Sequence, residues 1–126
     1  MAIFDADFLI SLEAGRASAQ QRDLELRARN VPLRVPAAAW VEYLSGVKIK
    51  RRETAQARLD QDVIFEPFTR ECAAVAVRLQ AACLEQGAMM GWNDLQIAAT
   101  AYLYDEPVVS NDKAFDKIPG LGRLGF

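Results

Sequence analysis

Short apolar runs alternate along the chain with longer segments in which apolar residues recur every three or four positions. Runs of the first kind are typical of strands buried in a sheet, and segments of the second kind are typical of helices with one face on a core. Proline at positions 32, 36 and 67 limits how far the strands can extend. We therefore expect strands over residues 1–4, 31–37, 62–68 and 107–110.

Helical periodicity fills the segments between these strands. Thr69 is a suitable N-cap for the longest of them, with Glu71 in its first turn and Gly87 at its end. The expected helices cover residues 8–13, 18–29, 37–47, 48–61, 69–86 and 93–102, and a short turn or helix is expected over 112–116.

Strands that alternate with helices predict an α/β fold, here a three-layer α/β/α sandwich with a parallel sheet of about five strands. The fifth strand is expected within residues 118–126. No repeat, linker or low-complexity segment divides the sequence, so residues 1–126 are expected to form a single domain. In such sheets ligands bind beyond the carboxyl ends of the strands, which is where candidate residues are sought.

Composition excludes several classes of function. The formal net charge is -2, so any attraction for nucleic acid must come from a local patch or a metal. Histidine is absent, which removes histidine-based triads, imidazole general bases and most zinc sites. We expect neither a signal peptide nor a membrane span, because the first apolar run is interrupted by Asp5 and Asp7 and no other run is long enough.

The two cysteines, Cys72 and Cys83, lie eleven positions apart on one expected helix. That spacing separates them by roughly 16 Å along the helix, too far for a disulfide. We expect two buried thiols, which suits a reducing, cytoplasmic location.

Four acidic residues stand beside apolar sequence where an isolated carboxylate is costly. Asp5 ends the first strand, Glu42 interrupts AAAWVEYLSG, Asp94 opens WNDLQIAATAYL, and Asp112 follows PVVSN. Each has an ordinary alternative role, as a helix cap, an exposed glutamate, a first-turn acid or a turn residue. Taken together, the four predict a divalent cation bound by all of them, and hence phosphodiester chemistry.

The expected cation is Mg²⁺ or Mn²⁺, as one ion or two, because both prefer oxygen ligands. Crowded carboxylates raise one another's pKa and so favour a bound cation, which can generate hydroxide from water and polarise a phosphate. Asp7 and Asp116 are secondary candidates, and Ser110 and Asn111 are candidates for orienting a ligand or phosphate.

A basic cluster in KIKRRETAQAR follows Glu42 closely. It is either a solvated helix face or a phosphate-backbone contact beside the acidic site. The candidates for contact with RNA are Lys48, Lys50, Arg51 and Arg52, with Arg58 on the same segment.

The segments IFDADFLISL, WVEYLSG, GWNDLQIAATAYL and VVSNDKAFDKIPGL resemble, in order, the motifs of PIN domains. More narrowly, they resemble the VapC-type toxins of bacterial toxin–antitoxin pairs, and the likeness runs from the first residues to the last. The sequence departs from the usual pattern at Ala6-Asp7, where a small polar residue and then asparagine or serine are common, and at Ser110, where threonine is usual.

The resemblance implies a metal-dependent ribonuclease directed at single-stranded RNA, with an acidic quartet at Asp5, Glu42, Asp94 and Asp112. It also implies the five-stranded parallel fold, a homodimer, and a cognate VapB-like antitoxin that forms a hetero-oligomer with the toxin. The tail of such an antitoxin would enter the active-site groove, often with an arginine.

Three other interpretations compete with this one. A haloacid-dehalogenase-like phosphatase would use Asp5 as its nucleophile, but its late aspartate pair would lie unusually near the end of the sequence. A phospho-receiver domain needs an aspartate after its third strand, where this chain has Glu66. A catalytically silent PIN-like binding or repressor subunit is the third, and the intact quartet argues against it.

Overall fold

The computed structural model describes residues 1–126, and its centre is one parallel sheet of five strands. The strands lie in the order β3-β2-β1-β4-β5, and every neighbouring pair is parallel. The bounds are β1 Ala2–Phe4, β2 Leu33–Pro36, β3 Ile64–Glu66, β4 Val108–Val109 and β5 Arg123–Leu124. The expected strands and their parallel arrangement are confirmed, including the short fifth strand near the end of the sequence.

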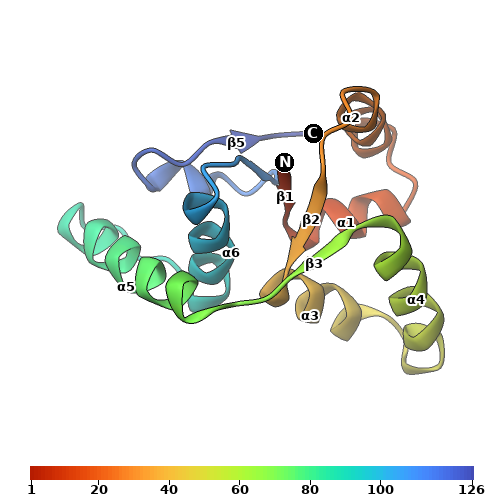
Figure 1. The fold of residues 1–126 in the computed structure, drawn as a ribbon, viewed down its shortest axis with the longest axis horizontal. Coiled ribbons are helices and arrows are strands. Elements are labelled where there is room, and N and C mark those ends of the chain that lie inside the picture. The colour runs from red at the N-terminus through yellow and green to blue at the C-terminus, as the bar shows by residue number, and fades with distance from the viewer.

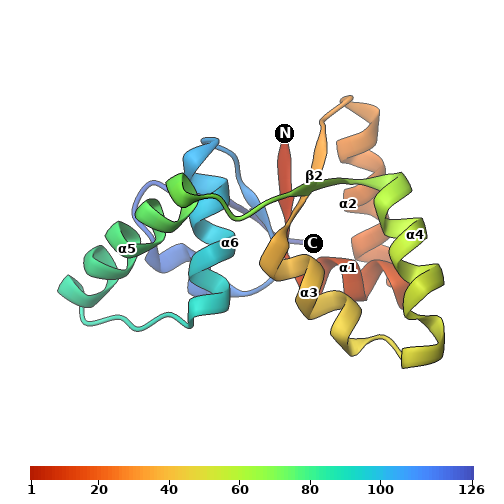
Figure 2. The ribbon, with the colours of Figure 1, turned by 60° about the horizontal axis from the view of Figure 1, so that its bottom comes forward.

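Helices cover both faces of the sheet (Figure 1). Their bounds are α1 Ala6–Glu13, α2 Ala17–Ala28, α3 Ala37–Gly46, α4 Arg52–Asp62, α5 Arg70–Glu85 and α6 Trp92–Leu103, with 3₁₀ turns η1 at Ile49–Arg51 and η2 at Lys113–Lys117. Figures 1 and 2 place α5 and α6 on one side of the sheet and α1, α2 and α4 on the other. Helix α3 contacts both α1 and α6, so it bridges the two sides. This is the three-layer sandwich predicted from the sequence.

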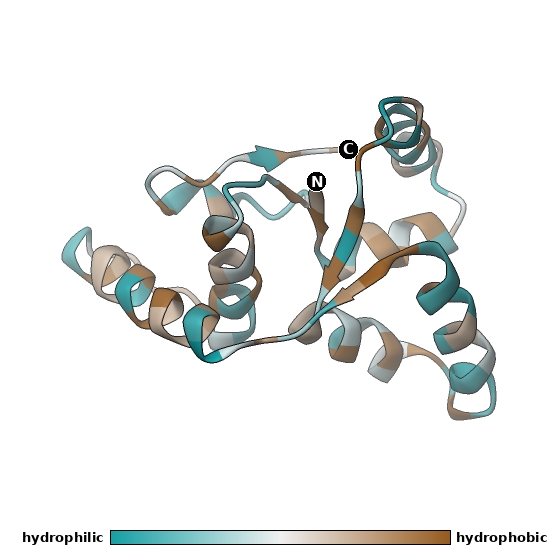
Figure 3. Cartoon of the chain, in the orientation of Figure 1, coloured by the Kyte–Doolittle hydropathy of each residue, from teal (hydrophilic) through white to brown (hydrophobic).

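The core lies where the central strands meet the helices. Ile3, Phe4, Val108 and Val109 are almost completely buried, because β1 and β4 have helices on both faces. Figure 3 shows the contrast between the brown central strands and the outer helix α4, which carries much teal. Leu59 is the only buried residue of α4. Its packing is therefore the main apolar contact that holds this helix against the rest of the fold.

The third strand is found where the sequence predicted a strand. It lies at the edge of the sheet, and Ile64 and Phe65 are 47% and 44% exposed. Only Glu66 of this strand is buried. An apolar run alone does not show whether a strand is central or lies at an edge.

Helix boundaries differ from the expected ones by a few residues. Helix α1 begins at Ala6 because Asp5 is its N-cap, and α2 begins at Ala17 rather than after Ser18. The glycines at 15 and 87 end α1 and α5 with φ of 73° and 70°, a conformation that glycine adopts without strain. Cys72 and Cys83 are free and buried on α5, as predicted. None of the helices combines the length and apolar character needed to cross a membrane.

Candidate active site

The candidate site lies at the carboxyl ends of β1 and β4. These strands are neighbours, although the chain runs from β1 outward to β3 and then returns to β4 on the other side of β1. The site therefore sits where the strand order reverses, the usual ligand position in open α/β sheets. Asp5 follows β1 and Ser110 follows β4, and the Ser110 hydroxyl donates to Asp5 Oδ2 at 2.8 Å.

Asp5 has two roles in the structure. Its Oδ1 accepts the Ala6 amide at 2.8 Å and so caps α1, while Oδ2 faces Ser110. The residue is 5% exposed. Burial raises the pKa of the Asp5 carboxyl from 3.8 to about 7, and repulsion from Asp7 and Asp94 adds to the rise, whereas the Ser110 hydrogen bond opposes it. Asp5 therefore caps α1 and belongs to the acidic site at the same time.

Asp7 shares the Ser110 hydroxyl with Asp5. Its Oδ2 lies 3.1 Å from Ser110 Oγ and accepts the Asn111 main-chain amide at 2.9 Å. A hydroxyl carries a single proton, so Ser110 cannot fully serve both carboxylates at once. The other oxygen, Asp7 Oδ1, is buried without any hydrogen-bond partner. This cluster has more acceptor oxygens than donors.

Glu42 on α3 and Asp94 on α6 belong to the same cluster of acids. Asn93, next to Asp94 in the first turn of α6, donates from Nδ2 to Glu42 Oε2 at 2.8 Å. Burial raises the pKa of Glu42, and the Asp94 charge raises it further. Burial likewise raises the pKa of Asp94, with smaller contributions from Asp112 and Asp7. From the sequence, Asn93 is expected only at the start of a helix. No pattern in the neighbouring residues indicates that its side chain contacts Glu42 on α3.

Asp112 completes the set at the start of η2. Its carboxylate caps η2 by accepting the Ala114 amide at 2.9 Å, and its own amide donates to Ser110 Oγ at 3.0 Å. The four acids predicted from the sequence thus belong to one electrostatic cluster, and Asp7 adds a fifth. They do not form a ready-made metal cage, because no three carboxylates have the mutual spacing of one.

The chemistry of these acids suits a divalent cation, although no three of them are spaced to hold one together in this arrangement. Ion pairs elsewhere in the structure engage Glu25, Asp23, Glu66, Glu106 and Asp116, but none involves the five clustered acids. Asp5, Glu42 and Asp94 are partly desolvated and are repelled by neighbouring acids, and Asp7 has an unpartnered buried oxygen. A hard cation that prefers carboxylate oxygen would relieve all three conditions. The side chains that could hold it are Asp5, Asp7, Glu42, Asp94 and Asp112.

Asp116 is engaged elsewhere. Arg123 binds both of its carboxylate oxygens, at 2.9 Å from Nε and 3.1 Å from Nη2, and this contact lowers the pKa of Asp116. The side-chain amide of Asn111 is also occupied, by the main chain of Phe126. The side chains of Asp116 and Asn111, both secondary candidates from the sequence, thus have partners within the protein.

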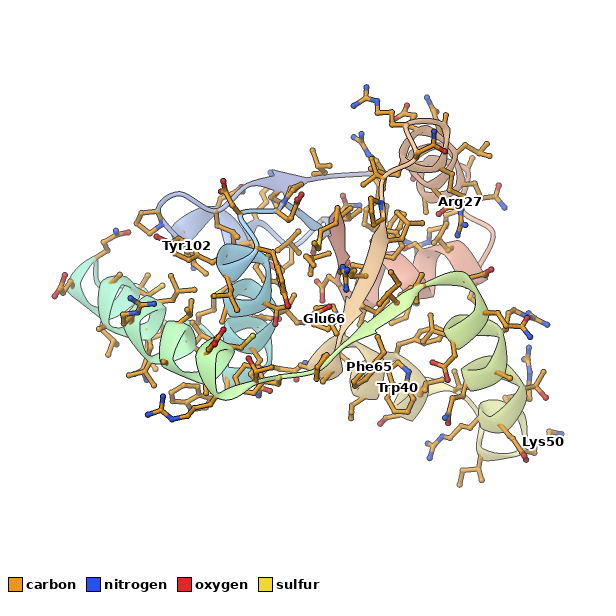
Figure 4. The ribbon with its side chains drawn as sticks, in the orientation of Figure 1. Arg27, Trp40, Lys50, Phe65, Glu66 and Tyr102 are labelled. Carbon is orange, nitrogen blue, oxygen red and sulfur yellow. The ribbon has the colours of Figure 1, made fainter.

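The residues of the basic cluster have different surroundings in the structure. Arg52 donates to the main-chain oxygens of Val47 at 2.9 Å and Ser45 at 2.8 Å, and so stabilises the end of α3. Lys50 and Arg51 instead line a cavity of about 520 Å³. Arg27 and Arg58 line the same cavity, its apolar part includes Phe4, Leu9, Leu12 and Leu59, and none of the five clustered acids contributes to it. Figure 4 shows Arg27 on α2 and Lys50 beside the start of α4, on the same side of the sheet.

Comparison with known proteins agrees with this geometry. The family model described as PIN domain matches residues 2–121. Ribonuclease VapC2 of Rickettsia felis is 31% identical over 104 residues, covering 79% of this chain and 78% of the relative.

Two solved structures extend the comparison. The first is VapBC2 from Rickettsia felis bound to a DNA fragment from its promoter, with a TM-score of 0.83 and 24% identity, covering 99% of this chain and 98% of that one. The second is a toxin–antitoxin complex from Klebsiella pneumoniae, with a TM-score of 0.75 and 25% identity, covering 96% and 95%. By its sequence match, its strand order and its acidic cluster, this chain belongs to the PIN-domain family, among the VapC-type proteins.

Proposed function

We propose that this chain is a metal-dependent endoribonuclease and the toxin of a type II toxin–antitoxin system. One structural observation carries the proposal: Asp5, Glu42 and Asp94, of which Asp5 is buried, have raised pKa values and converge at the strand-order reversal without an ion-pair partner. The name of the relative Ribonuclease VapC2 supports RNA as the substrate. The phosphatase alternative has no support from the comparisons, since the match over residues 2–121 is to PIN domains.

The proposed division of roles follows from the contacts. Asp5, Glu42, Asp94 and Asp112 would hold one or two Mg²⁺ or Mn²⁺ ions, with Asp7 as a further oxygen donor. When bound, such an ion supplies Lewis-acid activation of water and of the scissile phosphate. Ser110 keeps the carboxylates of Asp5 and Asp7 on one side of the site, and Asn93 fixes Glu42.

RNA cleavage by the purified chain tests the proposal. We expect cleavage in Mn²⁺ or Mg²⁺, loss of cleavage in EDTA, and loss of cleavage in Asp94→Asn. Asp105→Asn is a matched control, because Asp105 is exposed in a turn with φ 52°, which asparagine tolerates. If Asp94→Asn cleaves RNA as fast as the parent, the assignment fails. A parent chain that folds and binds metal but never cleaves RNA would favour the catalytically silent alternative.

The proposed partners include a cognate VapB-like antitoxin. Structures of similar proteins from Rickettsia felis and Klebsiella pneumoniae are toxin–antitoxin complexes. The 520 Å³ cavity is lined by apolar side chains, by four basic ones and by the acidic Glu13 and Asp62, which suits a peptide carrying apolar and charged residues. The acidic cluster itself would attract an arginine from the same partner. Co-purification with the product of a neighbouring gene encoding a DNA-binding antitoxin tests this pairing.

A homodimer is also proposed. Val41 and Phe65 are 56% and 44% exposed beside Trp40, around an apolar hollow of about 430 Å³ at the edge of the sheet. Figure 4 shows Trp40 and Phe65 side by side, and their rings stack edge-on at 5.7 Å. An apolar surface of this kind is typical of contact with a second copy. Light scattering on the parent and on Val41→Glu tests it.

The RNA contacts of Lys48, Lys50, Arg51 and Arg52 stay a prediction. Replacing Lys50 and Arg51 by glutamate should weaken RNA binding and its salt dependence if they touch phosphates. If binding is unchanged across a salt titration while binding of the antitoxin falls, these two side chains belong to the protein interface.

A further inference from the structure

Asn111 makes three hydrogen bonds that connect the acidic cluster to the last residues of the sequence. Its main-chain amide donates to Asp7 Oδ2 at 2.9 Å. Its side-chain Nδ2 donates to the main-chain oxygen of Phe126 at 2.9 Å, and its Oδ1 accepts the Phe126 amide at 2.8 Å. The side chain is therefore paired with the main chain of one residue, in the manner of two hydrogen-bonded strands.

The segment that Asn111 holds, Arg123–Phe126, is fixed from other directions as well. Arg22 on α2 donates from Nε to the Gly125 oxygen at 2.9 Å. Arg123 donates from Nη1 to the Ser110 oxygen at 3.1 Å. The Phe126 ring stacks edge-on against Phe8 with 5.0 Å between ring centroids. This segment is thus a fixed support against which the turn at residues 110–112 rests.

We propose that Asn111 is a positioning residue of the acidic site, acting through Phe126 rather than touching metal or RNA. This inference rests on the proposed function. The turn carries the Ser110 hydroxyl, which faces Asp5 and Asp7, and the Asn111 amide, which faces Asp7. Pairing of the Asn111 side chain with Phe126 sets the orientation of this turn, and so fixes where the two carboxylates lie.

Gly125 shows how closely the segment packs on Asn111. A Cβ added at this position would lie 3.3 Å from Asn111 Oδ1 and 3.4 Å from Arg123 Nη1, closer than ordinary van der Waals contact. The main chain thus passes directly beside the Asn111 side-chain amide.

Asn111→Ala removes both side-chain hydrogen bonds but keeps the main-chain amide that faces Asp7. Hydrogen exchange on the metal-free protein, Mn²⁺ titration calorimetry and RNA-cleavage kinetics are the measurements. We expect exchange at the amides of residues 111 and 126 to rise at least about tenfold, the Mn²⁺ dissociation constant to rise about tenfold, and kcat to fall with KM unchanged, since supporting residues of metal sites have effects of this size. Gln56→Ala, at an exposed amide on α4 with no hydrogen-bond partner, is the control and should change none of these.

Phe126→Ala is the second variant, because it loosens the same segment from the other end while leaving Asn111 intact. It should shift exchange and Mn²⁺ affinity in the same direction by a smaller factor, and it keeps the test decisive if Asn111→Ala fails to fold. Unchanged exchange and Mn²⁺ affinity in both variants, or a rise in KM alone, would overturn the inference. A parent chain that neither binds Mn²⁺ nor cleaves RNA would refute the proposed function instead, and the exchange measurement would still test the contact.

Discussion

Glu66 and Asp5 are both 5% exposed and both stand at the carboxyl end of a strand, yet their surroundings are opposite. Glu66 forms an ion pair with Arg34 at 2.6 Å and accepts a hydrogen bond from the Tyr104 hydroxyl. Asp5 has a serine, a main-chain amide and other acids around it, and no cation. In Figure 4 the Glu66 side chain lies at the centre of the molecule, beside the β3 edge.

The difference separates structural acids from functional ones. A buried carboxylate with an internal cation is compensated when the chain folds, and removing it leaves the partner unpaired. A buried carboxylate among other carboxylates is compensated only by something from outside. The proposed role of Asp5 as a binding residue rests on this second condition.

The largest difference between Asp5 and Glu66 is expected in RNA-cleavage activity. Asp5→Asn should reduce RNA cleavage by about 1,000-fold or more, equivalent to about 4 kcal/mol of transition-state stabilisation, because a cation loses a carboxylate ligand. The folded state should not lose stability at pH 7, since a repelled buried charge disappears. Cleavage assays and urea denaturation on the same preparations check both points, and full activity in Asp5→Asn would contradict the comparison.

The second contrast is in the pH dependence of stability without metal. The pKa of Asp5 is raised from 3.8 to about 7 on folding, so between these values the folded state binds more protons than the unfolded state. Stability from this group is therefore full below about pH 4 and falls as pH rises toward 7, by as much as about 4 kcal/mol. Denaturation in EDTA at a series of pH values should show this slope in the parent and not in Asp5→Asn. Identical slopes in the two proteins would show that Asp5 titrates normally.

The third difference concerns Glu66, whose replacement should lower stability and leave activity unchanged. Glu66→Gln leaves the Arg34 charge, whose side chain is 26% exposed, without its partner, and should lower the free energy of unfolding by about 3 kcal/mol. Cleavage per folded molecule should stay close to that of the parent. Urea denaturation and cleavage at low temperature measure the two effects. A loss of activity without a loss of stability would place Glu66 among the functional acids.

Cation binding should distinguish the two regions as well. Mn²⁺ at 100 times its dissociation constant should stabilise the parent by about 2.7 kcal/mol. The same stabilisation is expected in Glu66→Gln but not in Asp94→Asn, and thermal unfolding with and without Mn²⁺ at pH 7 provides the measurement. Equal stabilisation of Asp94→Asn would place the cation elsewhere.

The acidic site could be predicted from the sequence because its signals are local. An apolar run followed by a carboxylate marks the end of a buried strand, as at Asp5, and an acid in the first helical turn before an apolar stripe marks Asp94. The parallel sheet and its helices follow from the same alternation. Together these place the acids at one edge before any coordinates are known.

The structural acid could not be predicted in the same way. Arg34 and Tyr104 lie 32 and 38 positions from Glu66, and they meet it only through the pairing of β2 with β3 and the packing of α6. The contact of Asn111 with Phe126 likewise depends on where β5 ends. Register and helix packing involve the whole chain, so no local pattern reveals which polar side chains find internal partners.

The smallest contrast comes from two hydroxyl groups that each donate to a buried carboxylate. Tyr104→Phe removes a donor from Glu66, and Ser110→Ala removes the donor that Asp5 shares with Asp7. Each loss should cost about 1.5 to 3 kcal/mol at pH 7, the usual value for a hydrogen bond to a charged group. At pH 5 in EDTA the cost of Ser110→Ala should shrink, because Asp5 is then protonated and needs less stabilisation of its charge, whereas the cost of Tyr104→Phe should persist. Urea denaturation at the two pH values measures this, and equal pH dependence in the two variants would mean that Asp5 and Glu66 are compensated alike.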